Sequence, residues 1–168
     1  MKQFKYIIFL FLSATLLGCG PYSFTGTSIK DNIKTFQVNY FQNTADLIEP
    51  GFDRDFTLAL QDLITNQTNL NLTTTNGDLV YEGEITQYRI SPTTAQANST
   101  AAQNRLTVNV RVRFFDKNEP DEEFEQSFSF FYDYSGNELL QGAQKDTAHE
   151  EIFERITQDI FNATLAKW

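Results

Sequence analysis

The chain has few of the side chains on which most enzyme and metal sites depend. One cysteine, Cys19, and one histidine, His149, occur in 168 residues. A zinc site needs several such ligands at set spacings, and no glycine-rich phosphate loop or G-x-S-x-G motif is present. We therefore expect no enzyme, no cofactor and no metal site, and His149 is expected to be a surface residue near a helix N-terminus.

Long hydrophobic runs are also missing. The only apolar stretch near the N-terminus, Tyr6–Leu17, has 12 residues, whereas a membrane span needs roughly 20. Lys2 and Lys5 precede it, and a small residue, Gly18, separates it from Cys19. This order is typical of a bacterial lipoprotein signal, in which the cysteine becomes the lipidated first residue of the mature chain.

These features divide the chain into three parts. Residues 1–18 are predicted to be a lipoprotein signal peptide, residues 19–34 a lipidated tether, and residues 35–168 a single domain. Two or more acyl chains on Cys19 would give stable membrane attachment. With Cys19 modified, no thiol remains, so the fold needs no disulfide and no Cys–His pair exists.

Basic residues are scarce. Removing Lys2 and Lys5 leaves 11 basic residues against 22 acidic ones. A chain this acidic is a poor general binder of nucleic acid or of an anionic surface. Contact with an anionic ligand would need a local basic patch.

Strands are predicted on both sides of the first helix. Thr35–Phe41 alternates, and its apolar side carries Phe36, Val38 and Tyr40. Leu70–Thr74 and Leu79–Ile90 flank the turn signal Asn76-Gly77-Asp78, which predicts a hairpin.

The second half contains the clearest strands. In Asn104–Asp116, apolar residues alternate with polar ones, and Glu123–Tyr134 repeats the pattern. Residues 91–103 are rich in Ala, Ser, Thr and Gln and are predicted to be a loop.

Two segments have helical spacing. Apolar residues recur from Phe52 to Ile64, and again from Ile152 to Ala163. Thr147 and Glu150 have the spacing of a capping box, which predicts that the second helix begins at Thr147. The order β-α-β-β-β-β-α predicts an α+β two-layer sandwich, with a small, mostly antiparallel sheet and both helices on one face.

Acidic residues suggest two weaker sites. Glu82 and Glu84 share one side of a strand, as a glycosidase pair could, but two solvated charges on an open sheet face explain them better. The acidic run around Asp121–Glu125 lacks the spaced ligands and glycine of a calcium loop.

Arginines gather in spite of the acidic composition. Arg105, Arg111 and Arg113 share the polar side of one strand, and Arg89 lies on the preceding strand. They could bind phosphate or carboxylate groups of a lipid or sugar. Alternatively they form cross-strand ion pairs, with Arg113 opposite Glu125.

Aromatic residues gather in Phe128–Tyr134. This set either completes a large core with one exposed ring or anchors a partner. The candidate partner contacts are Phe128, Phe130, Phe131, Tyr132 and Tyr134.

Five stretches resemble one known family when taken in order. They are CGPYSFTGTSI, VNYFQN, GDLVYEGEITQY, NRLTVNVRVRFF and DIFNATLAKW. Together they resemble the LptE-type lipopolysaccharide-assembly lipoproteins, over essentially the whole chain from Cys19 to Trp168. The resemblance implies two helices on one face of a small sheet, with Cys19 as the lipidated residue.

The resemblance also implies a function. LptE-type proteins act as assembly factor and plug of an LptD-type β-barrel, which passes lipopolysaccharide to the outer leaflet of the outer membrane. No acidic cluster follows Cys19, which favours anchoring at the periplasmic face. The alternative is a free-standing periplasmic lipoprotein that binds an anionic lipid or glycan through its arginine-bearing sheet face.

Thr147 has a second interpretation besides capping. Asp146-Thr147-Ala148 resembles an O-glycosylation sequon used by some bacteria, so a modified Thr147 is left open.

Overall fold

The computed structural model describes residues 29–93, 103–119, 124–135 and 139–166. The predicted signal peptide, Cys19 and most of the predicted loop at 91–103 lie outside these residues. Within them, no helix is long and apolar enough to cross a membrane.

Three long strands form an antiparallel meander. They are β4 (Leu79–Thr93), β5 (Gln103–Asp116) and β6 (Phe124–Ser135). β5 lies between the other two, and its pairing with β4 extends from Leu79 opposite Asp116 to Thr93 opposite Gln103. β4 therefore continues through Pro92, past the end predicted at Ile90, because its last residues still pair with β5.

The alternation along these strands builds the core. On β5, the inward residues are fully buried or nearly so, and they are Leu106, Val108, Val110, Val112 and Phe114. Ile85 and Tyr81 of β4 and Phe128 of β6 join them. Burying an aliphatic or aromatic side chain of this size stabilises the fold by about 1.5–3 kcal/mol.

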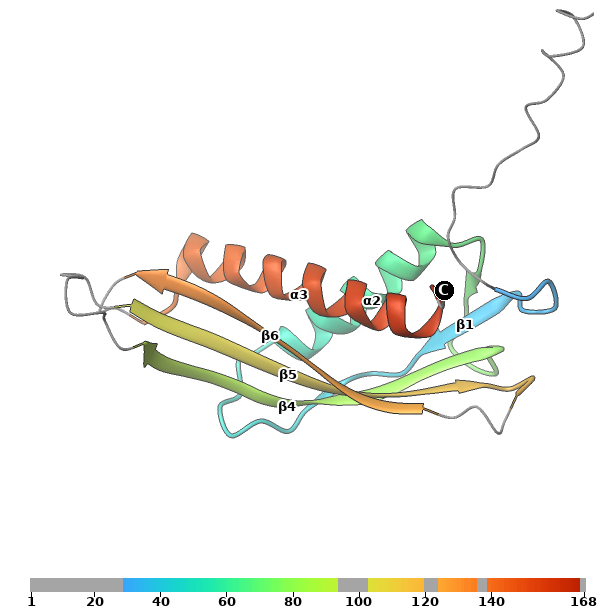
Figure 1. Ribbon diagram of the computed structural model, residues 1–168, viewed down its shortest axis with the longest axis horizontal. Coiled ribbons are helices and arrows are strands. Elements are labelled where there is room, and N and C mark those ends of the chain that lie inside the picture. The colour runs from blue at the N-terminus through green and yellow to red at the C-terminus, as the bar shows by residue number, and fades with distance from the viewer. Residues whose placement is uncertain (1–28, 94–102, 120–123, 136–138, 167–168) are drawn as a thin grey trace, which may run out of the picture.

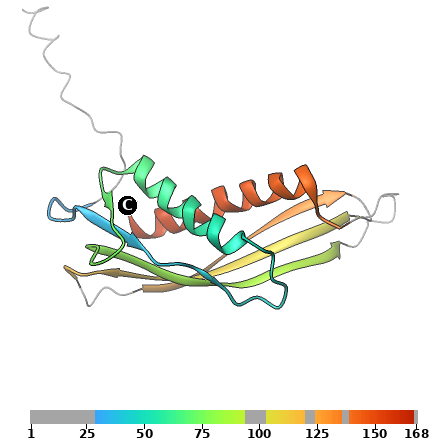
Figure 2. The same cartoon turned by 180° about the vertical axis from the view of Figure 1, so that it is seen from behind.

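Two helices cover this apolar side of the sheet. α2 (Phe52–Gln67) and α3 (Gly142–Thr164) both lie on the same face, and the other face is left open (Figures 1 and 2). Their buried stripes include Phe56 and Leu60 of α2 and Ile156 of α3. The predicted α+β two-layer sandwich is therefore confirmed, and most of the sheet pairing is antiparallel.

The predicted start of α3 at Thr147 is wrong. The helix begins at Gly142, so Thr147 lies within it and donates a hydrogen bond to the Ala143 carbonyl oxygen (3.0 Å) in place of capping. A tertiary contact favours the extra turn, because Lys145 pairs with Glu49 at 2.7 Å, on the segment before α2. Modification of Thr147 stays a prediction.

The predicted hairpin between Leu70–Thr74 and Leu79–Ile90 is also wrong. The strand order is β3-β1-β4-β5-β6, in which β1 (Thr35–Val38) lies between β3 (Asn71–Leu72) and β4. β1 is parallel to both of its neighbours. The turn at Asn76–Asp78 therefore carries the chain past β1 without joining adjacent strands.

Asp78 explains why β1 lies there. Its carboxylate accepts hydrogen bonds from the backbone amides of Lys34 and Thr35 and from the Thr35 hydroxyl, all at 2.9 Å. A Cβ on Gly77 would lie 2.7 Å from the Gln37 nitrogen, so only glycine permits this approach. The segment Asn76–Asp78, which the sequence predicted to be a hairpin turn, instead holds the start of the parallel strand β1 in place.

The predicted strand Thr35–Phe41 is interrupted. After β1 ends at Val38, a separate short strand, β2 (Gln42–Asn43), pairs with β4. The interruption shifts by one residue which side chains point to the core. Phe41 is therefore fully buried, whereas Tyr40, expected on the apolar side, is 54% exposed. The Phe41 ring occupies the space above Gly83, where a Cβ would lie 2.5 Å from it.

We expect Asp78→Asn to destabilise the protein by about 1–3 kcal/mol, because the backbone donors lose a charged acceptor. The hydrogen bonds from Lys34 and Thr35 lower the pKa of the Asp78 carboxyl. Its stabilising contribution is therefore full above its ordinary pKa of about 3.9 and is lost as pH falls through the lower folded value. Urea titrations at several pH values measure both effects.

The matched control is Asp62→Asn on the exposed side of α2. This variant should stay within about 0.5 kcal/mol of the wild type. Equal losses in the two variants would contradict the role given to Asp78.

Candidate functional site

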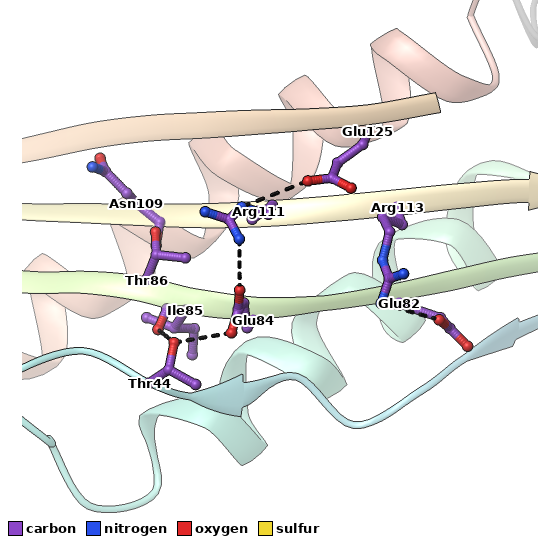
Figure 3. Close-up of polar contacts among 9 residues, drawn as sticks. All are labelled: Thr44, Glu82, Glu84, Ile85, Thr86, Asn109, Arg111, Arg113 and Glu125. Carbon is purple, nitrogen blue, oxygen red and sulfur yellow. Dashed lines mark hydrogen bonds and ion pairs between the residues drawn. The ribbon is translucent and has the colours of Figure 1, made fainter. Parts of the chain in front are cut away.

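The open face of the sheet carries most of the polar side chains singled out from the sequence. Glu82 and Glu84 of β4, Arg111 and Arg113 of β5 and Glu125 of β6 all project from it (Figure 3). Their placement follows from the alternation that sends the intervening residues into the core. We call these five residues the charged lattice.

Cross-strand register sets the ion pairs of the charged lattice. Arg111 lies opposite Glu84, and the Nη1–Oε1 distance is 3.0 Å. Arg113 lies opposite Glu82, with 3.8 Å between Nη2 and Oε2. Arg111 also approaches Glu125 diagonally, at 3.7 Å between Nε and Oε1.

The sequence prediction for Arg113 was partly correct. Arg113 does lie opposite Glu125 in the register of β5 and β6, but its ion pair forms with Glu82 on the other neighbouring strand. All these groups are partly exposed, so each pair contributes only about 0.2–1 kcal/mol. With three carboxylates and two guanidinium groups, the charged lattice has a small net negative charge.

Neutral side chains hold the carboxylates in place. Asn39 Nδ2 donates to Glu82 Oε1 at 2.8 Å, and Thr44 Oγ1 donates to Glu84 Oε2 at 3.1 Å. Both donors lie in the segment around β2, which pairs with β4 at Glu84. Figure 3 shows Thr44 beside Glu84. A shallow hollow of about 520 Å³ on the open face is lined by the charged lattice together with Asn39, Tyr40, Gln42 and Gly83.

Arg105 forms a separate pair near the far end of β5. Its Nε and Nη2 donate to the two carboxylate oxygens of Asp133, both at 2.7 Å. These hydrogen bonds lower the pKa of the Asp133 carboxyl. The guanidinium also covers the Phe131 ring, with Cζ 3.7 Å from the centroid, which is a cation–π contact.

Arg89 is the exception among the four candidate arginines. It is exposed on β4, opposite Thr107 of β5. Among the described residues it has no ion-pair partner. A second hollow, of about 480 Å³, is lined by Arg89, Gln87, Asn109 and Leu47.

The aromatic set at Phe128–Tyr134 is divided between two environments. Phe128 and Tyr134 are buried, and Phe130 and Tyr132 pack partly against the core. Phe131 is on the open face and is 44% exposed. Only this last ring has a large free surface for a partner.

The described residues offer little to catalysis. In the ranges that the structure describes, no group of three or more His, Cys, Asp or Glu side chains could hold a metal ion. Glu82 and Glu84 are each engaged with an arginine and a neutral donor, as expected for charges on an open sheet face.

His149 is not the surface residue expected from the sequence. It lies inside α3, half-buried, with its ring 4.8 Å from Phe52 of α2. Its Nε2 is 2.9 Å from the Tyr88 hydroxyl of β4. Burial lowers the pKa of His149, against an opposing effect of Glu49. Sequence reasoning missed this cluster because it depends on the packing of α3 against Phe52 of α2 and Tyr88 of β4, which no local pattern shows.

Comparison with known proteins supports one family. The family model described as LptE, lipopolysaccharide-assembly, matches residues 33–164. No curated protein sequence matches the chain.

Several solved structures share the fold at low sequence identity. The hypothetical protein CT253 from Chlamydia trachomatis has 13% identity and a TM-score of 0.50, with 77% of this chain and 96% of that chain covered. Rare lipoprotein B from Shewanella oneidensis has 13% identity and a TM-score of 0.43, with 75% and 89% covered. The first similarity supports the fold alone, and the second is too low to support an inference.

The half-buried position of His149 predicts a pH effect on stability. Because its folded pKa is depressed, the neutral ring is favoured in the folded state above the ordinary pKa of about 6.5. Stability is then lost as pH falls through the folded value. The groups facing the ring are Tyr88 of β4, Glu49 before α2, Asp55 of α2, and Lys145 and Asp146 of α3.

We expect His149→Gln to reduce this loss, since Gln does not titrate but can still hydrogen-bond to Tyr88. Thermal unfolding of both proteins between pH 7.5 and pH 5 measures the difference. Parallel pH curves for the two proteins would show that His149 does not contribute.

Proposed function

The chain belongs to the LptE lipopolysaccharide-assembly family, and we propose that it acts as assembly factor and plug of an LptD-type β-barrel in the outer membrane. Membership makes it an LptE-type lipoprotein associated with the outer membrane. The finer proposal is that it supports lipopolysaccharide transport to the outer leaflet from the periplasmic face, anchored by lipid on Cys19. The family match over residues 33–164 is the observation that carries the proposal.

The open face of the sheet suits the inside of a large barrel. The lumen of such barrels is polar and hydrated. The charged lattice and the Arg105–Asp133 pair present charges that are already balanced by neighbours within 4 Å. These paired charges stay hydrated in a polar lumen, so their insertion does not bury a charge without a partner.

The overall charge fits a plug better than an independent lipid binder. The formal net charge is −9, which repels anionic headgroups and sugars. The free-standing binder remains the second candidate. The observation that favours it is the exposed Arg89, which has no ion-pair partner within the part of the chain that the structure describes. Arg105, Arg111 and Arg113 would each have to leave a carboxylate before they could bind an anion.

Depletion of the protein separates the two candidates. If it assembles the barrel, depletion should lower the mature, folded barrel and surface lipopolysaccharide together, and an ectopic wild-type copy should restore both. Heat-modifiability on gels and surface labelling measure them. Normal levels of both after depletion would overturn the plug proposal and leave the free-standing binder.

The anchor is tested by Cys19→Ala. Without the thiol no diacylglycerol can be attached, so the variant should remain in the soluble periplasmic fraction and lose the mobility shift that globomycin causes in the wild type. Two acyl chains give stable membrane attachment where one does not. A variant that still fractionates with the membrane at high salt would contradict lipid anchoring through Cys19.

A further inference from the structure

One edge of the sheet has no partner strand among the residues that the structure describes. β6 ends the strand order, and its 12 residues pair with β5 on one side only. Among the described residues, none hydrogen-bonds to the backbone along its other side. Figure 1 is viewed from this side, where β6 crosses in front of β5.

The other free edges are protected and this one is not. On the side away from β5, β4 has no partner strand beyond Ile85 among the described residues. A register irregularity follows Ile85, however, and Pro92 lacks the amide that a further strand would need. β3 has only two residues. β6 contains no Pro, Gly or Lys, although natural sheets use such devices to keep edge strands from pairing.

Charge does not protect the β6 edge either. Its two acidic residues are drawn toward β5, since Glu125 approaches Arg111 and Asp133 is held by Arg105. The seven residues between, Gln126–Tyr132, carry no charge. The centre of the strand is therefore open to pairing.

Aromatic and arginine side chains border this edge on both faces. The Phe130 and Phe131 rings are stacked, with centroids 5.8 Å apart, although consecutive strand residues point to opposite faces. Arg105 covers Phe131, and Arg155 of α3 lies 5.4 Å from the Phe130 centroid. Aromatic and arginine side chains dominate the binding energy of protein interfaces.

We propose that the free edge of β6 receives an extended segment of a partner protein as an added strand. Main-chain hydrogen bonds to β6 supply the affinity of such strand addition, and side-chain contacts on the two faces supply its specificity. On the helix side, the added strand packs beside Phe130 and Arg155. On the open face it packs beside Phe131.

Charge favours a different protein with a basic segment as the occupant. The formal net charge of this chain is −9. A segment with Lys or Arg complements this charge, whereas a second copy of the chain repels it. The inference does not depend on the partner being a lipopolysaccharide translocon.

Hydrogen exchange tests the added strand directly. The full-length lipoprotein is exchanged in outer-membrane fragments and again after purification alone in detergent, with single-residue resolution by mass spectrometry. We expect alternate amides of Gln126–Tyr132, those not bonded to β5, to exchange at least about tenfold more slowly in the membrane. The amides of β4 beyond Ile85 should exchange alike in the two samples.

A pair of variants connects this protection to the edge. Phe131→Lys places a charge on the edge strand, and Thr107→Lys places the same charge directly opposite it on β5. The first should abolish the slow exchange, and the second should leave it unchanged. Matching melting temperatures of the two variants show that both fold.

The outcomes are distinct. Two results would overturn the inference: the β6 amides exchange equally fast in both samples, or Thr107→Lys removes the slow exchange as fully as Phe131→Lys does. Either result can occur while depletion still lowers the amount of barrel, so the proposed function would then stand without the added strand. Slow exchange together with co-isolation of two differently tagged copies would show a second copy at the edge and overturn the choice of occupant. Slow exchange without co-isolation, in cells whose barrel does not depend on the protein, would uphold the added strand and reject the plug.

Discussion

The structure depends on the strict alternation of side chains along β5. From Leu106 to Phe114 every second residue enters the core, and the residues between them carry the arginines of the open face. A slip of one residue against either neighbour would bury those arginines and expose the valines. The packing of both helices and the ion pairs of the charged lattice therefore rest on the same register.

This constraint explains what could be predicted from the sequence. In β5, β6 and α2 the periodic patterns are long and only one face is apolar, so the sequence pattern predicted these elements correctly. The strands β1 and β3 are too short for periodicity to show their partners, and their parallel pairing depends on contacts between residues about 35 to 45 positions apart, such as Asp78 with Lys34. A local turn signal at Asn76–Asp78 therefore indicated the wrong neighbour.

The sequence predicted which residues make up the candidate site but not which of them form ion pairs. Alternation placed Arg105, Arg111 and Arg113 on the open face, and the choice of partners followed from β4 lying alongside β5, which no sequence pattern gives. Likewise Phe131 could be recognised as the odd aromatic in β6. That β6 ends the sheet, and that Phe130 and Phe131 stack at its edge, required the strand order.

The two faces of the sheet have different roles in this LptE-type protein. The helix-covered face supplies stability, and the open face and the β6 edge are the surfaces that we propose contact other molecules. Affinity purification of the tagged, lipidated protein from detergent-solubilised outer membrane, with the mass of the isolated particle, tests this account most directly. We predict one large β-barrel protein per copy of this chain. Recovery of the protein alone, or with lipid or glycan only, would contradict the account.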